Sequence, residues 1–73
     1  MDRIIKNCSC SLQVWWGDEP VYEERNIYFN NKKEVKEYLN GKLQSYKGEM
    51  IECYVYQYQK GKPHEALVVL EIK

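Results

Sequence analysis

The stretch Cys8-Ser9-Cys10-Ser11-Leu12-Gln13-Val14-Trp15-Trp16 decides the class of fold. Apolar residues stand at positions 8, 10, 12, 14 and 16, and polar residues at 9, 11 and 13. This period of two is typical of a strand with one buried face. Gly17-Asp18-Glu19-Pro20 predicts a turn, and the more charged residues 21–29 predict a second strand. The two strands are expected to form a hairpin whose second strand lies at a sheet edge, where charges discourage further pairing.

A single helix is predicted over residues 31–47. Asn31 suits the N-cap, and Glu34 follows at the spacing of a capping box. Gly48 is the expected stop. The apolar residues of the segment recur at helical spacing and form one stripe, made of Val35, Tyr38, Leu39, Leu43 and Tyr46.

Residues 50–59 and 64–72 predict two further strands, joined by a slightly open loop at Lys60-Gly61-Lys62-Pro63. The last strand is apolar on both sides, which indicates a central position in the sheet. The order is therefore β-β-α-β-β in a single domain, residues 1–73. The expected core consists of Leu12, Val14, Ile27, Phe29, Val35, Leu39, Leu43, Val55, Val68 and Leu70.

The fold class predicted from this order is α+β. We expect a four-stranded mixed sheet of order 2-1-4-3, with one helix on one face. Strands one and four would lie parallel in the centre, and the charged second strand would lie at an edge. This arrangement resembles the β-grasp topology, a likeness of strand order alone that carries no functional conclusion.

Composition narrows the class of function. The chain has 73 residues, with 11 basic and 11 acidic side chains, so a dedicated nucleic-acid binder with a basic excess is disfavoured. A chain this short has little room for an enclosed catalytic pocket, so a binding protein is favoured over an enzyme. The three cysteines are an odd number, and the sequence shows neither an apolar run of signal-peptide length nor a membrane span. A cytoplasmic location with reduced thiols is expected.

The residues that could carry metal or thiol chemistry are Cys8, Cys10, Cys53 and His64. In the inferred hairpin, His64 is roughly five residues along the strand from the level of Cys53, or more than about 10 Å at ~3.3 Å per residue. That separation is too great for a shared zinc ion or a Cys–His nucleophilic pair. The cysteines are interpreted as small apolar core residues. No catalytic residue, metal or cofactor is expected.

Aromatic residues of the strands are the strongest functional signal. The inferred pairing places six of them on the sheet face opposite the helix: Trp15, Tyr22, Tyr28, Tyr54, Tyr56 and Tyr58. Contiguous exposed aromatics usually mark an interface. The alternative is a β-propensity effect, since Tyr and Trp suit strands and tolerate water at the polar tip.

Two functions are compatible with such a face. The first is a non-enzymatic protein-binding module whose partner is another protein or a second copy of the chain, as a homodimer. The Lys-, Asn-, Ile- and Tyr-rich composition favours a phage or mobile-element product that inhibits a host protein. The second is a single-stranded nucleic-acid-binding protein that uses sheet-face aromatics and helix lysines. Against the second stand Glu24, Glu52, Glu65 and Glu71, expected on the same face.

Overall fold

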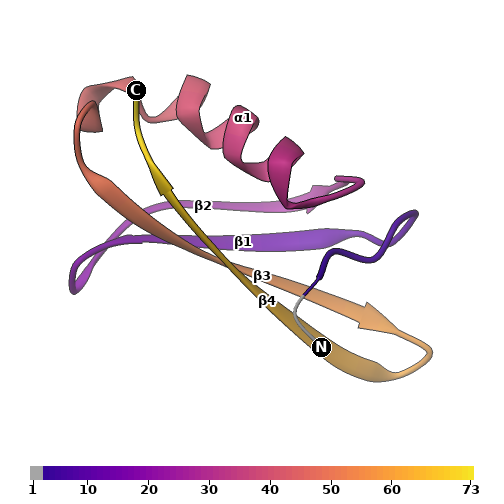
Figure 1. Cartoon of the computed structure of the whole chain (residues 1–73). Coiled ribbons are helices and arrows are strands. Elements are labelled where there is room, and N and C mark those ends of the chain that lie inside the picture. The colour runs from indigo at the N-terminus through magenta and orange to yellow at the C-terminus, as the bar shows by residue number, and fades with distance from the viewer. Residues whose placement is uncertain (1–2) are drawn as a thin grey trace.

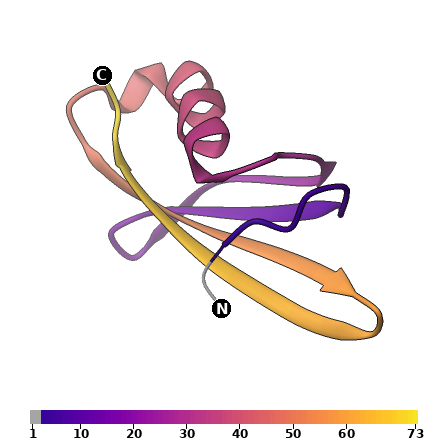
Figure 2. The same ribbon diagram turned by 45° about the vertical axis from the view of Figure 1, so that its right-hand side comes forward.

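The computed structural model describes residues 3–73. The elements are β1 (Cys10–Trp16), β2 (Glu19–Ile27), α1 (Lys32–Lys42), the short 3-10 helix η1 (Gln44–Tyr46), β3 (Met50–Gln59) and β4 (Lys62–Glu71). α1 lies on one face of a twisted four-stranded antiparallel sheet (Figure 1). Within the described residues, no helix or strand covers the opposite face, as the turned view in Figure 2 also shows. The predicted α+β class, element order and single α-helix are confirmed.

The predicted strand order is wrong. The order is β2-β1-β3-β4, and β1 pairs antiparallel with β3, so the sheet is not mixed and strands one and four are not neighbours. The crossover from β2 to β3 through α1 therefore spans about two strand spacings, roughly 10 Å, where the predicted order needs about three, or roughly 14 Å. The shorter crossing suits an 11-residue helix with short connections. The β-grasp likeness depended on a central parallel pair and is not confirmed.

Helix α1 begins as predicted and ends earlier. The Asn31 side chain accepts a hydrogen bond from the Glu34 N–H at 2.9 Å, as an N-cap does. The Glu34 carboxylate accepts from the Asn30 N–H at 2.7 Å, one residue before the position that a capping box uses. The helix ends at Lys42, directly after Gly41, and the chain continues as the 3-10 turn η1. The helix-weakening effect of glycine is consistent with this early end.

The pairing of β1 with β2 contains two irregularities that the sequence pattern does not show. Cys10 pairs with Ile27 as predicted, but Val14 pairs with Tyr22, one residue out of the expected register. The register shifts lie between Cys10 and Ser11 and between Val14 and Trp15. Asn26, with φ +60°, is the extra residue at the first shift. Because side chains alternate with a period of two, a one-residue slip moves the middle of β2 to the other face.

The β3–β4 hairpin is tighter than predicted. Gln59 pairs with Lys62, so the turn consists of Lys60 and Gly61 alone. Their φ values are +52° and +76°, which fits a type I′ turn. The pairs shift by two residues from the predicted ones, which leaves every side chain on its predicted face. In such a hairpin Pro63 directs its backbone nitrogen away from β3, and an edge strand tolerates this because no ladder bond is lost.

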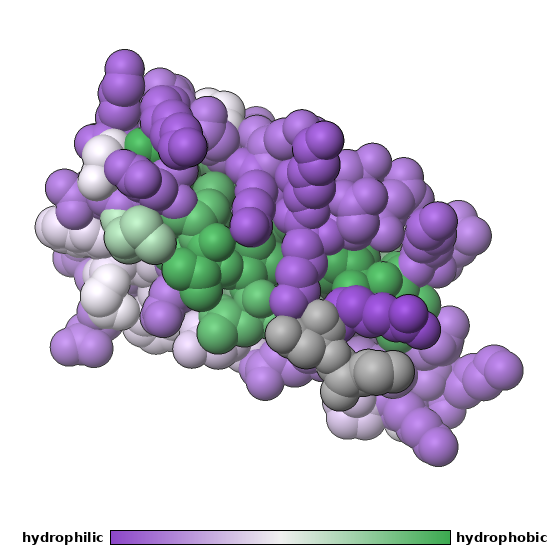
Figure 3. Space-filling model, viewed as in Figure 1, coloured by the Kyte–Doolittle hydropathy of each residue, from purple (hydrophilic) through white to green (hydrophobic). Residues whose placement is uncertain are grey.

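The core lies between α1 and the sheet. Nine of the ten predicted core residues are buried, and Ile27 is half-buried against them. The residues before β1 join this core through Ile4, which is buried, and through Gln57 of β3. The Gln57 side chain accepts from the Ile5 N–H at 2.9 Å and donates to the carbonyls of Ile5 at 2.8 Å and Cys8 at 3.1 Å. A band of hydrophobic atoms is visible across the middle of the molecule, bordered by hydrophilic side chains (Figure 3).

Candidate partner-binding site

The sheet face turned away from α1, here called the open face, is built by alternate residues of the four strands. On β3 these are the positions between the buried Ile51, Cys53 and Val55. Cross-strand partners extend the face to β1 and β4, because directly opposite residues share a face. Its members are Ser11, Gln13, Trp15, Pro20, Glu23, Arg25, Met50, Glu52, Tyr54, Tyr56, Tyr58, Pro63, Glu65, Leu67, Val69 and Glu71.

Four of the six predicted aromatic residues lie together on this face. Tyr54, Tyr56 and Tyr58 follow one another along β3, and Trp15 stands on the neighbouring β1 opposite Glu52. Tyr56 is 38% exposed and Tyr58 is 72% exposed, whereas Trp15 and Tyr54 are half-buried. The predicted grouping is therefore correct for the residues of β1 and β3.

Tyr22 is not on the open face, contrary to the prediction. The register shift in β2 turns Tyr22 and Glu24 toward the helix, where the hydroxyls of Tyr22 and Tyr38 each donate to the Glu24 carboxylate at 2.5 Å. The hydrogen bond from Tyr22, then that from Tyr38, holds the pKa of the Glu24 carboxyl below its ordinary value. The hydrogen bonds among these three side chains link the edge strand β2 to α1.

For Tyr28, the sheet pairing does not confirm the predicted position on the open face. This residue follows the end of β2 and is 64% exposed, next to the buried Phe29. Since it belongs to no strand, the sheet pairing does not place it with the other aromatics.

Three apolar residues of the face were not among the predicted partner-binding residues. Leu67 and Val69 of β4 are 38% and 43% exposed, and Met50 of β3 is 57% exposed. Leu67 stands directly opposite Tyr54, so the aliphatic residues continue the aromatic group toward the sheet edge. The signal was present as apolar residues on both sides of β4, but it was interpreted as a central strand.

Carboxylates border this apolar centre. The charged members of the open face are four glutamates, Glu23, Glu52, Glu65 and Glu71, against Arg25, which gives a net charge of −3 from four negative and one positive. Arg25 lies 4.0 Å from Glu23. Partial burial and then the neighbouring Glu65 raise the pKa of the Tyr56 hydroxyl. The face therefore combines apolar and aromatic side chains with glutamates that stand among and beside them.

A shallow pocket of about 370 Å³ opens at one end of this face, here called the acidic notch. Two aromatic rings and two carboxylates line it, with a glycine between them: Trp15, Gly17, Asp18, Glu52 and Tyr54. Gly17 has φ +62°, a value that glycine adopts without strain in the β1–β2 turn.

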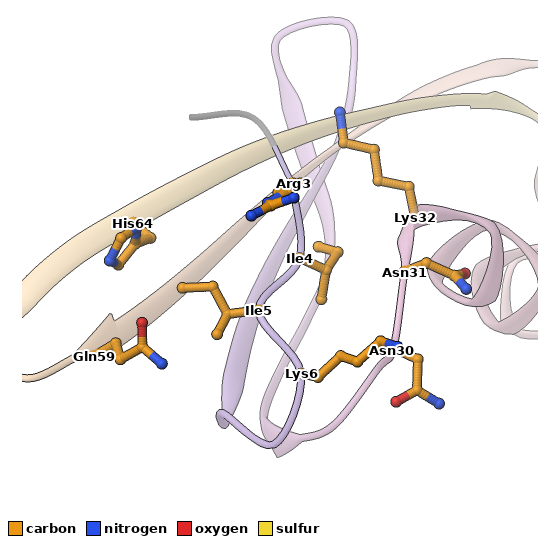
Figure 4. Close-up of a pocket in the computed structure, with 9 residues that line it drawn as sticks. All are labelled: Arg3, Ile4, Ile5, Lys6, Asn30, Asn31, Lys32, Gln59 and His64. Carbon is orange, nitrogen blue, oxygen red and sulfur yellow. The ribbon is translucent and has the colours of Figure 1, made fainter.

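Cationic residues gather at a different place. A pocket of about 630 Å³ lies between the residues before β1, the start of α1 and the β3–β4 hairpin (Figure 4). Its charged or basic lining residues are Arg3, Lys6, Lys32 and His64, and Ile4 and Ile5 form its apolar part. Gln59 and His64 hold core-side positions in the alternation of β3 and β4. This pocket is therefore on the helix side of the sheet.

Cys10 and Cys53 belong to the core, as interpreted, whereas Cys8 does not. Cys10 and Cys53 are buried, and burial raises the pKa of both thiols, to about 12 for Cys53, which disfavours the reactive thiolate form. Cys8 is half-buried and its thiol donates to the Tyr58 carbonyl at 3.1 Å. Among residues 3–73, no group of three or more His, Cys, Asp and Glu side chains is placed to hold a metal ion.

Comparison with known proteins gave no significant match to a family model, a curated protein or a solved structure. In the part of the chain that the structure describes, no helix has the length and apolar character needed to cross a membrane.

Proposed function

We propose that this chain is a small, non-enzymatic protein-binding module that contacts its partner through the open face. The observation that carries the proposal is the exposed apolar group of Tyr56, Tyr58, Leu67, Val69 and Met50 on a sheet face without a covering layer among residues 3–73. Exposed contiguous apolar surface on a small domain is characteristic of interaction sites. Tyr and Trp are also the residues that dominate binding energy at protein interfaces.

The charge distribution favours a protein over a single-stranded nucleic acid. Nucleic-acid binders place cations beside the rings on which bases stack, because the phosphates must be neutralised. Here the rings are surrounded by glutamates, while Arg3, Lys6 and His64 line a pocket on the helix side. Arg25 is on the open face but lies 4.0 Å from Glu23, so the rings and the main group of cations do not form one binding surface.

The Lys-, Asn-, Ile- and Tyr-rich composition supports a more specific form of this proposal, in which the chain is a phage or mobile-element inhibitor of a host protein. A cytoplasmic phage or mobile-element protein that inhibits a host protein needs only one binding surface and no catalytic site. The open face would occupy a surface of the host protein and block its normal contacts. Self-association into a homodimer is the competing form of the same proposal.

The test compares Tyr56→Ser with Lys36→Glu. Tyr56 is central in the group, and its side chain opens no cavity in the core when it is removed. A loss of ~2 kcal/mol, or roughly thirtyfold in affinity, is expected for Tyr56→Ser. Lys36→Glu on α1 should bind normally. The measurement is affinity capture from the source cell with each variant immobilised, preceded by size-exclusion chromatography with light scattering to detect a homodimer.

Normal capture by Tyr56→Ser together with loss in Lys36→Glu would refute the proposal and place the function on the helix side. A labelled single-stranded oligonucleotide that shifts at low salt, with a shift that Lys36→Glu weakens, would favour the nucleic-acid alternative. Circular dichroism of both variants controls for folding.

A further inference from the structure

The acidic notch has a composition that the rest of the open face lacks. It combines the carboxylates of Asp18 and Glu52 with the rings of Trp15 and Tyr54 in a pocket of about 370 Å³. Trp15 and Glu52 are direct cross-strand partners on β1 and β3, and Asp18 comes from the β1–β2 turn. Three separate segments therefore converge on this pocket.

Neither carboxylate of the notch has a hydrogen-bond or ion-pair partner within residues 3–73. By contrast, Glu23 on the same face lies near Arg25, and Glu24 and Glu34 accept hydrogen bonds on the helix side. Among residues 3–73, no lysine, arginine or histidine lines the notch. Both carboxylates therefore line one pocket, and no cationic side chain of the described residues lines it with them.

A guanidinium group fits this set of residues. It is planar, it binds carboxylates through paired N–H groups, and it stacks on aromatic rings. Cation–π attraction is strongest over Trp and is also present over Tyr. An ammonium group could meet the charge but could not offer the flat surface that the two rings complement.

We propose that the partner of the open face inserts an arginine side chain into the acidic notch, while its apolar residues cover Tyr56, Leu67 and Val69. This inference rests on the proposed protein-binding function and adds the chemistry of the partner. It also gives the partner a basic character, complementary to the net charge of −3 on the open face.

The test uses two synthetic peptides of about twelve residues with the same apolar sequence. One carries a central arginine and the other carries citrulline, which has the same shape without the charge. Each is titrated into the ¹⁵N-labelled chain and followed by NMR chemical shifts. The arginine peptide should shift the Trp15 indole N–H and the amides of Asp18 and Glu52, with an affinity about fivefold or more above that of the citrulline peptide.

Two variants locate the effect. Asp18→Asn and Glu52→Gln should each reduce the arginine preference and leave binding of the citrulline peptide unchanged. The matched control is Glu71→Gln, an exposed open-face glutamate outside the notch, which should keep the preference. The preference should also weaken as salt rises, because the groups are exposed.

Equal affinity of the two peptides for the open face would overturn the arginine inference and leave the protein-binding proposal standing. Arginine-dependent shifts confined to residues outside the notch would overturn it as well. A different result would show that the protein-binding proposal itself fails, namely normal partner capture by Tyr56→Ser. Well-dispersed spectra of the variants exclude unfolding as the cause of any loss.

Discussion

At the residue scale, Gln57 is a polar side chain in a position that alternation reserves for the core. It is 3% exposed and follows the buried Ile51, Cys53 and Val55 on the same side of β3. Its amide satisfies three backbone groups of residues 5 and 8, so it binds the segment before β1 to the sheet. A buried amide with all of these bonds made stabilises a structure, whereas the same groups left unpaired destabilise it.

Gln57→Leu should therefore destabilise the fold by about 1–3 kcal/mol, although leucine is apolar and fits a core position. The substitution leaves the Ile5 N–H and the carbonyls of Ile5 and Cys8 without their partner. Urea unfolding measures the change, and hydrogen exchange of the Ile5 amide should accelerate. Gln59→Leu, at an exposed position of the same strand, is the control; equal stability of wild type and Gln57→Leu would show that these bonds contribute nothing.

Glu24 should make stability depend on pH. Its folded-state pKa is lowered by the hydrogen bonds from Tyr22 and Tyr38. A carboxyl with a depressed folded-state pKa stabilises the fold above its unfolded-state pKa, and this contribution is lost as the pH falls through the folded-state pKa. The melting temperature of the wild type should fall more between about pH 7 and about pH 3 than that of Glu24→Gln, which lacks the titrating group.

Glu37→Gln on the exposed side of α1 is the control for this comparison and should keep the full decrease. Glu34, whose pKa is also lowered, remains in all three proteins and contributes equally to each. Parallel pH profiles for wild type and Glu24→Gln would contradict the assigned role of the Tyr22–Glu24–Tyr38 contact.

At the element scale, the β3–β4 hairpin depends on two residues with positive φ. Gly61 at +76° adopts this conformation freely, whereas Lys60 at +52° does so at a cost. Type I′ turns favour Asn followed by Gly, because both residue types tolerate the left-handed region. The sequence Lys60-Gly61 therefore has the right residue at the second position and a less favourable one at the first.

Substitutions at the two turn positions should have opposite signs. Gly61→Ala should destabilise the fold by about 1–2 kcal/mol through backbone strain, since an added methyl meets no atom within 4 Å. Lys60→Asn should stabilise the fold by a few tenths of a kcal/mol, because Asn tolerates the left-handed conformation that this turn position requires. Thermal unfolding measures the change in stability of each variant. A stabilising Gly61→Ala would exclude the type I′ turn.

At the scale of the whole molecule, the strand order sets where the apolar surface of β4 lies. As an edge strand, β4 has its open-face residues Leu67 and Val69 at the margin of the sheet. In the predicted order, both would lie in the middle of the open face, with β1 on one side and β3 on the other. The antiparallel β1–β3 pair also brings Trp15 next to Glu52 and so creates the acidic notch.

The strand order can be checked directly in solution. NMR should show cross-strand NOEs between Leu12 and Val55 and between Val14 and Cys53, which are partners in the β1–β3 pair. Antiparallel partners approach closely enough for such contacts. Parallel NOEs between β1 and β4, without the β1–β3 set, would restore the order 2-1-4-3.

The sequence by itself determined the elements and the faces of β1, β3 and β4. Alternation in residues 8–16 and 50–59 identified the buried side of each strand, and Asn31 marked the helix start through its capping side chain. These signals are local, because each depends on the direction of neighbouring side chains along one segment. They were sufficient for the core and for the grouping of Trp15 with Tyr54, Tyr56 and Tyr58.

The tertiary structure alone decided the strand order and which residues of β2 face the helix. Alternation fixes the face of a side chain, but it carries no information on which strand lies beside it, so orders 2-1-4-3 and 2-1-3-4 bury the same residues. The register shift near Asn26 moves Tyr22 and Glu24 to the helix side, and the partner that fixes them there, Tyr38, is 14 residues from Glu24 in the chain. A bulge stabilised by such a distant contact leaves no periodic signal in its own strand.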